Sequence, residues 1–285
     1  MNWPKLLNRV ALQRGAPPTG LAPIRLDDLP QSIGDSSLAR WEHFGSTMSE
    51  CSNAEGWAVG ANEQLYWTGP QTIEPLRRLV SSVVENEWSC DIRQVVGVTQ
   101  SKSPLERFRS LDELALVASP ELSADVSPEN LRSNLAHRGI RIGQPHSTDC
   151  FRRRLWDRGR IFLCNGDGSH HFAAARYIAG QLGQRVILKG PLWTYRIEIA
   201  VLRELLSQFE LFAIAITELG EFGDWMERCR APFFEVRLPG SYERAQAVLL
   251  PRSNSRASKA ALELNRAGVT NLGLHLEALA ISQPA

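Results

Sequence analysis

The sequence predicts a chain of the α/β or α+β class, with a mixed sheet and flanking helices. Short apolar segments typical of strands alternate with amphipathic segments typical of helices through most of its 285 residues. Its content of 43% hydrophobic and 22% charged residues is ordinary for a globular protein. Gly, Pro, Ser and Asp are frequent at the start of the chain. We therefore expect a loop-rich extension over residues 1–56, with one short helix near its start, and a single domain over residues 57–285.

Apolar periodicity places the elements of the first half. It predicts, in order, a strand–turn–strand at residues 56–69, an amphipathic helix at 72–89, a buried strand at 91–100, a helical segment at 103–119 and a helix at 127–139. The valines near residue 80 fall close to helical spacing, whereas the apolar run after residue 94 is short and β-branched. Ser127 and Pro128 form a favourable helix start, and Gly139 follows its basic end.

The second half continues the alternation. The pattern predicts an extended segment at 140–143, a helix at 150–159, a strand at 160–165, a helix at 169–183 and a strand at 184–190. It then predicts buried or strand-rich segments at 193–202, 210–219 and 232–238, a helix at 241–250, and one or two helices within 256–280, split at Gly268. This order of elements favours a sheet covered by helices.

Charge and cysteine usage limit the class of protein. The 32 lysines and arginines nearly balance 31 acidic residues, so the net charge of +1 gives no global attraction for nucleic acid or an anionic membrane. None of the five cysteines forms a C-x-x-C pair, which argues against a zinc cluster and favours reduced thiols. The sequence shows neither the apolar core of a signal peptide nor a membrane span, so we expect a cytoplasmic protein.

The segment "RIFLCNGDGSHHFAAARYIA", residues 160–179, is the strongest candidate for a site. A glycine-rich turn that leads into a helix presents unpaired N–H groups and the positive end of the helix dipole, which together accept phosphate. Gly166 and Gly168 allow a positive φ or the close approach of a ligand, and Asp167 or Ser169 can cap the helix. A turn with an N-cap and no ligand is the simpler interpretation.

Two adjacent histidines follow the turn, in the first turn of the predicted helix. The helix dipole disfavours a charged imidazole there and tolerates a neutral one, so His170 and His171 are candidate ligand contacts rather than cations. Adjacent helical residues point about 100° apart, which argues against a metal pair.

These residues carry a resemblance to a known family. Asp167, Gly168 and His170 match the "D-G-x-H-R" motif of the ParB/sulfiredoxin-like superfamily, which lies between a strand and a helix at a nucleotide phosphate site. By the order of its elements, the chain resembles that superfamily over residues 93–200. The resemblance implies Mg²⁺-dependent nucleotide hydrolysis or phosphoryl transfer. Asp167 would contact the metal or water, the Gly168 and Ser169 amides would hold phosphate, and His170 with His171 would polarise it.

Several departures from the motif limit the activities that the resemblance implies for this chain. Ser169 stands where sulfiredoxin-like reductases have their nucleophilic cysteine, which argues against that redox activity. No helix-turn-helix of the ParB-like partition proteins is visible downstream. His171 stands where the motif has an arginine, so the planar fork that clamps phosphate is missing.

Arginines elsewhere can replace the missing one. The segment 150–160 carries five arginines, of which we take three as ligand contacts or as a grip on a polyanion: Arg154, Arg158 and Arg160. The alternative is a solvated helix face whose arginines pair with neighbouring aspartates. A second basic segment, residues 252–266, offers a further anion contact if Ser255 caps its helix, or else forms a polar loop and a surface helix.

Phosphoryl transfer also needs a carboxylate that holds a metal, and often a base. Asp167 is the local carboxylate, with Asp149, Asp157 and Glu198 as candidate partners. His146 is a candidate base or a hydrogen-bonded structural histidine. The sequence thus predicts a protein that binds a nucleotide or another phosphorylated small molecule. A non-catalytic interaction or regulatory protein on the same fold, and a nuclease or DNA-binding module, are the alternatives.

Overall fold

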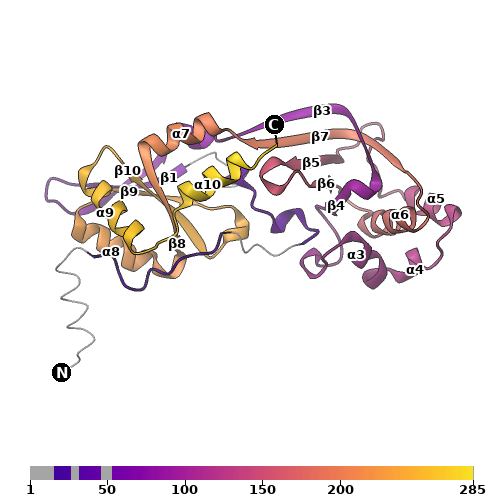
Figure 1. The fold of residues 1–285 in the computed structure, drawn as a ribbon, viewed down its shortest axis with the longest axis horizontal. Coiled ribbons are helices and arrows are strands. Elements are labelled where there is room, and N and C mark those ends of the chain that lie inside the picture. The colour runs from indigo at the N-terminus through magenta and orange to yellow at the C-terminus, as the bar shows by residue number, and fades with distance from the viewer. Residues whose placement is uncertain (1–15, 27–31, 46–52, 285) are drawn as a thin grey trace, which may run out of the picture. The chain divides into compact units, whose positions relative to one another are not determined.

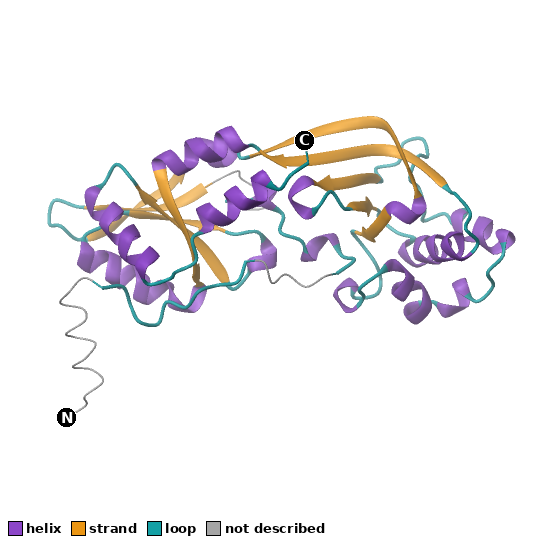
Figure 2. Cartoon of the chain, viewed as in Figure 1, coloured by secondary structure: helices purple, strands orange, loops and turns teal. Residues whose placement is uncertain are grey.

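The computed structural model describes residues 16–26, 32–45 and 53–284, and its chain divides into two compact units. The first unit contains the described parts of residues 1–28, 40–80 and 197–281, and the second those of residues 29–39, 81–196 and 282–285. Figure 1 labels their elements and Figure 2 separates helices from strands. The α/β class is confirmed. The sequence predicts one domain over residues 57–285, whereas the contacts form two units; the short helix expected near the chain start lies outside the described residues.

The first unit contains an antiparallel sheet of five strands in the order β2-β1-β9-β10-β8. The strands are β1 (Asn53–Val59), β2 (Leu65–Thr72), β8 (Phe209–Ala215), β9 (Phe233–Arg237) and β10 (Ala245–Pro251). The helices are α2 (Glu74–Arg77), α7 (Ile199–Gln208), α8 (Leu219–Cys229), α9 (Ser255–Arg266) and α10 (Leu272–Ile281). Its core joins the inner face of the sheet to α8 and α9, with Phe212, Phe222, Trp225 and Phe233 buried together.

The second unit contains a mixed sheet of five strands in the order β3-β7-β5-β6-β4. The strands are β3 (Val80–Asp91), β4 (Val95–Val98), β5 (Cys150–Arg154), β6 (Ile161–Cys164) and β7 (Ile187–Ile197). The helices are α3 (Leu111–Ala118), α4 (Pro120–Ser123), α5 (Pro128–Leu135) and α6 (Ser169–Gln181). β6 runs parallel to β4 and antiparallel to β5. Phe172, Ala173, Ala175 and Ala179 of α6 are buried in a core shared with α3 and the sheet.

Three predicted helices are wrong, and each is a strand for the same reason. Residues 72–89 form only the short α2 before β3, residues 150–159 form β5 and a 3₁₀ turn, and residues 241–250 contain β10. β3 pairs with β7, which is distant in the sequence. β5 and β10 are central strands, and each has one nearby partner, β6 or β9, and one distant partner, β7 or β8. The hydrogen bonds between strands, together with the packing of β-branched or half-buried side chains, stabilise the strand more than the local helical spacing stabilises a helix. The segment predicted as a strand or as extended at residues 140–143 forms no strand: residues 140 and 141 have no regular structure, and residues 142 and 143 form a turn.

Local signals at helix ends were more reliable guides. The Ser127 hydroxyl accepts a hydrogen bond from the Asn130 N–H at 3.2 Å and caps α5, as predicted. Gly268 takes a φ of +76° and separates α9 from α10. The cap of α9 is Asn254 rather than Ser255, because the Asn254 side chain accepts from the N–H groups of Arg256 and Ala257. Among the described residues, no helix has both the length and the hydropathy that crossing a bilayer requires.

Two glycines bring the end of α5 against the start of α6. Gly168, the N-cap of α6, has a φ of +75°, and a Cβ on it would lie 2.6 Å from the carbonyl carbon of Gly139. A Cβ on Gly139 would lie 2.8 Å from the Gly168 nitrogen. Both distances are far shorter than a real Cβ contact, so the two backbones touch only because neither residue has a side chain.

We predict that Gly168→Ala lowers the free energy of unfolding by about 2 kcal/mol or more, because it combines an unfavourable positive φ with a backbone clash. Gly180→Ala in the same helix is the matched control, since a Cβ there meets no atom within 4 Å. That variant should gain about 0.5–1 kcal/mol from higher helix propensity. Urea unfolding of the two variants measures both changes, and equal effects would contradict the close approach of the backbones.

Candidate functional site

The turn between β6 and α6 rests on the loop that follows β4. The buried Asn165 side chain donates hydrogen bonds to the carbonyl oxygens of Gln100, at 3.1 Å, and Asp167, at 2.9 Å. The Asn165 N–H donates to the Thr99 hydroxyl at 3.1 Å. Because β4 and β6 are parallel neighbours, their carboxyl ends open at the same edge of the sheet, which is the usual place for ligands in α/β folds.

A pocket of about 220 Å³ opens at this edge. Three of its lining residues belong to the predicted site: Gly166, Asp167 and Ser169. The other three come from the loop after β4 and were not predicted: Gln100, Ser101 and Lys102. The Ser169 hydroxyl donates to the Ser101 hydroxyl at 3.0 Å and joins the two sides. The clue in the sequence was the polar run after a short buried strand, but its place beside the turn depends on the sheet order.

The N-terminus of α6 carries no side-chain cap. Gly168 occupies the N-cap position, so neither Asp167 nor Ser169 caps the helix as the sequence predicts. The Asp167 carboxylate instead accepts the N–H of Gly168 itself, at 2.7 Å. Since the first N–H groups of a helix lack partners within the helix, this end is available to a ligand in the pocket.

Asp167 is exposed and carries its charge at neutral pH. The hydrogen bond from the Gly168 N–H is the largest cause that lowers its pKa, and electrostatic interactions with Lys102, His137 and Arg138 lower it further. Lys102 and Arg138 make the surroundings of the turn locally basic, although the chain as a whole is nearly neutral. The pocket thus combines one carboxylate with a positive field.

The two histidines lie beside the pocket and do not line it. His170 Nε2 is 3.0 Å from the Ser103 hydroxyl. His171 Nδ1 lies 2.9 Å from Asn134 Oδ1. Since the Asn134 amide nitrogen donates to carbonyl oxygens of α4 and α5, His171 Nδ1 is the donor of this bond. The His171 ring also stacks on His137, with centroids 3.7 Å apart and planes 11° apart.

Burial lowers the pKa of both imidazoles. For His170 the second cause is the charge of Lys102, and for His171 the next causes are His137 and His170. A proton on either ring would therefore be unfavourable, and both are neutral at pH 7. Their hydrogen bonds fix the first turn of α6 against α5 and the loop after β4.

The predicted arginine contacts lie elsewhere in the second unit. Arg154 is buried in an ion pair with Asp35. Arg160 pairs with Asp157 at 2.8 Å, and the exposed Arg158 follows the 3₁₀ turn after β5 with a φ of +56°. None of the three lines the pocket beside the turn. Arg154 is the last residue of β5, and Arg158 and Arg160 follow that strand, so the three do not share the helix face that the sequence suggested.

A different arginine approaches the turn. A Cβ on Gly166 would lie 2.5 Å from Nη2 of Arg141, so this guanidinium lies directly against the turn. The buried Asp149 holds it, with Nη2 and Oδ1 3.2 Å apart. Asp149 is thus occupied by Arg141. His146, the candidate base, is exposed in a turn shortly before Asp149 in the sequence. Glu198, a candidate partner of Asp167, belongs to the first unit.

The donor set around Asp167 limits what metal it can hold. Within residues 16–26, 32–45 and 53–284, no group of three or more His, Cys, Asp or Glu side chains could hold a metal ion. Asp167 is the single carboxylate of the pocket. The hydrogen bond with Cys150, and then burial, raise the pKa of the Cys164 thiol at the end of β6, which makes this thiol less reactive.

We predict that the histidines make stability depend on pH. Because folding lowers their pKa below the ordinary 6.5, the neutral rings contribute stability that is complete above pH 6.5 and is lost as the pH falls below it. His171→Gln keeps a donor for Asn134 but cannot be protonated. The difference in melting temperature between about pH 7 and about pH 5 should therefore be smaller in this variant than in the wild type. His146→Asn, at an exposed turn, is the control; an equal change in both variants would contradict the prediction.

Comparison with known proteins gives a family match. Residues 85–285, well over half of the chain, match the sequence model of a family of unknown function, DUF6685. This range includes β4, the turn at residues 165–168 and α6, so the pocket beside the turn lies within it. No curated protein and no solved structure matches the chain. The chain therefore belongs to the family DUF6685.

Proposed function

We propose that the pocket beside the turn binds the phosphate group of a nucleotide or of another phosphorylated small molecule. The observation that carries the proposal is a polar pocket of about 220 Å³ at a helix N-terminus that no side chain caps. The N–H groups at this end point away from the helix at the positive end of its dipole. A phosphate is the common ligand of such an arrangement.

Two cations support this assignment. Lys102 lines the pocket and is exposed, so its ammonium can reach a bound anion. Arg141 lies against Gly166 and is held by Asp149, which keeps its guanidinium in one orientation. A guanidinium fixed in this way supplies the planar fork that His171 lacks. Arg141 lies against Gly166 but is not among the residues that line the pocket, so we propose it, in place of Arg154, Arg158 and Arg160, as a contact for a phosphate that extends past Gly166.

Asp167 fits Mg²⁺ in one coordination mode. Mg²⁺ is usually held by one or two carboxylates and completes its shell with substrate phosphates and water. A single exposed carboxylate suits this mode, whereas the described residues contain no cage of protein ligands. When bound, Mg²⁺ would neutralise phosphate charge. Hydrolysis or phosphoryl transfer also requires a base, and both histidines beside the pocket hold structural hydrogen bonds. Binding is therefore the function that the geometry supports best.

The resemblance of Asp167, Gly168 and His170 to the ParB/sulfiredoxin-like motif supports the same pocket. The DNA-binding alternative gains less support, because the arginines of β5 already have carboxylate partners. Arg153 pairs with Glu85 at 3.5 Å, and Arg152 lies 3.7 Å from Asp35. A regulatory protein without catalysis would retain the phosphate pocket and lack turnover.

The test measures binding at the turn itself. We expect ATP, CTP or GTP with Mg²⁺, or inorganic pyrophosphate, to shift the amide resonances of Gly168 and Ser169 in a nitrogen-15 NMR titration. Lys102→Gln should weaken binding about tenfold, because it removes a charged donor. Lys189→Gln, which changes an exposed lysine of β7 outside the pocket, should leave the affinity unchanged.

Several outcomes would reject the proposal. If none of these probes shifts Gly168 or Ser169, the pocket binds no phosphate. If Lys102→Gln and Lys189→Gln weaken binding equally, the ligand binds elsewhere.

Nucleotide turnover that is lost in Asp167→Asn would add catalysis to binding, whereas binding without turnover would favour the regulatory alternative. Salt-sensitive retention of DNA, without any shift at Gly168, would favour the nucleic-acid alternative.

A further inference from the structure

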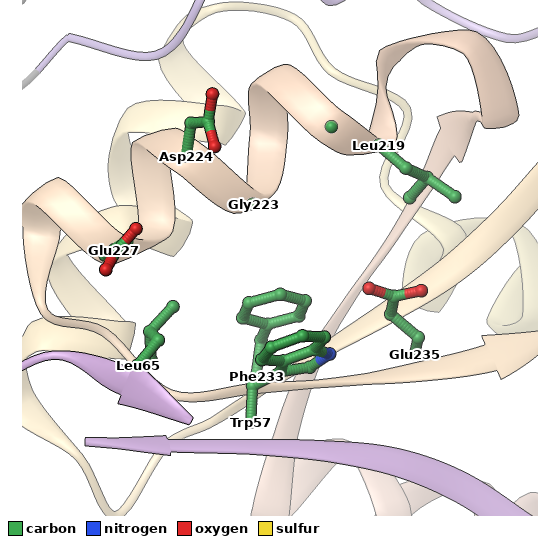
Figure 3. Close-up of a pocket in the computed structure, with 9 residues that line it drawn as sticks. Trp57, Leu65, Leu219, Gly223, Asp224, Glu227, Phe233 and Glu235 are labelled. Atoms are coloured by element: carbon green, nitrogen blue, oxygen red, sulfur yellow. The ribbon is translucent and has the colours of Figure 1, made fainter. Parts of the chain in front are cut away.

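The first unit contains a second pocket of a different chemical character. Its volume is about 350 Å³, within the range of small-molecule sites. Helix α8 forms one wall of this pocket, and β1, β2 and β9 form the other (Figure 3). All of its lining residues belong to one unit, so its geometry is set by one core.

Aromatic rings form the strand side of this pocket. Trp57 of β1 and Phe233 of β9 are direct cross-strand partners, and their rings stack with centroids 5.9 Å apart and planes 12° apart. Figure 3 shows both rings between the strands and α8, with Leu65 beside them. The Nε1 atom of Trp57 is buried, and its interaction with the Glu235 carboxylate lowers the pKa of that group against the larger effect of burial. This wall offers ring faces and apolar surface to a ligand.

Two glycines keep the helix side open. Gly220 and Gly223 lie three residues apart on the pocket face of α8, and a Cβ on either would meet no atom within 4 Å. Each glycine in a helix costs about 0.5–1 kcal/mol relative to alanine. Packing within the protein does not require these glycines. Their effect is to leave a space that side chains would fill.

The charged residues of the pocket are all acidic. Asp224 and Glu227 project from α8, and Glu235 projects from β9 (Figure 3). No lysine, arginine or histidine is among the lining residues. Glu235 also faces Glu55 directly across the β1–β9 pair. Burial, and then the charge of Glu55, raises the pKa of Glu235, because like charges opposite each other in a sheet are unfavourable. A cation in the pocket would relieve this repulsion.

We propose that this pocket binds a small organic cation, an ammonium group that carries apolar substituents. The charge lies toward Asp224, Glu227 and Glu235, and the apolar part packs against Trp57 and Phe233. Tryptophan is the best cation–π partner among side chains, and substituted ammonium ions are bound by aromatic walls of this kind. A hydrated metal ion would make no use of the rings, an anion would be repelled, and a neutral apolar ligand would gain nothing from three carboxylates.

The first experiment compares a cation with a neutral molecule of the same shape. Choline and benzyltrimethylammonium are titrated into the full chain, and 3,3-dimethylbutan-1-ol serves as the uncharged counterpart of choline. The readout is the nitrogen-15 resonance of the Trp57 indole N–H, identified from its loss in Trp57→Phe. We expect both cations to shift this resonance to saturation, and the alcohol to bind at least about tenfold more weakly.

The second experiment blocks the space. Gly223→Leu places a side chain in the pocket without a clash at its Cβ and should abolish the shift. Gly180→Leu makes the same change in α6, at an exposed helical glycine outside the pocket, and should leave binding intact. Circular dichroism and thermal unfolding report whether each variant is folded.

The third experiment removes the charge. Asp224→Asn with Glu227→Gln changes two exposed side chains, so the fold should tolerate it. The double variant should weaken choline several-fold and leave the alcohol unaffected. The proposal is overturned if neither cation shifts the Trp57 resonance, if the alcohol binds as tightly as choline, or if Gly223→Leu leaves binding unchanged.

Discussion

The contact between the backbones of Gly139 and Gly168 fixes the geometry of the pocket beside the turn. It holds the first turn of α6 against the end of α5, just after the chain leaves β6. Asp167 and Ser169, on either side of Gly168, then reach the pocket, and His171 reaches Asn134 and His137. The hydrogen bonds of Asn165 secure the other side of the turn to the loop after β4. The site is therefore set by close backbone packing, and its side chains take positions that this packing determines.

Local chemistry made part of this predictable. The turn, α6, the Ser127 cap and the break at Gly268 all depend on residues a few positions apart, and each was predicted from them. The strands β3, β5 and β10 were missed because each has a partner distant in the sequence: β7 pairs with β3 and with β5, and β8 pairs with β10. Arg154 is an example of a single side chain whose contact could not be predicted from the local sequence. Its partner, Asp35, lies 119 positions away, so nothing near Arg154 reveals a buried ion pair.

The residues of the candidate site likewise divide into those that local sequence predicted and those that it missed. Gly166, Asp167 and Ser169 were predicted because glycines and a helix start lie together in the sequence. Lys102 and Arg141 were missed, since they reach the turn only through the parallel pairing of β4 with β6 and through the α5–α6 contact. The rule that the carboxyl ends of parallel neighbours share an edge explains why the polar loop after β4 belongs to the site. Applying that rule requires the strand order, which periodicity does not provide.

The net charge of +1 conceals two pockets with opposite preferences. Lys102 and a helix N-terminus favour an anion in one, while three carboxylates and stacked rings favour a cation in the other. At physiological ionic strength, salt screens exposed charges beyond about 8 Å, so each field acts mainly within its own pocket. A nearly neutral chain can then select charged ligands of either sign without attracting polyions over long distances. The two binding proposals thus share one physical basis, a local geometry in which a few glycines determine where charge and open space coincide.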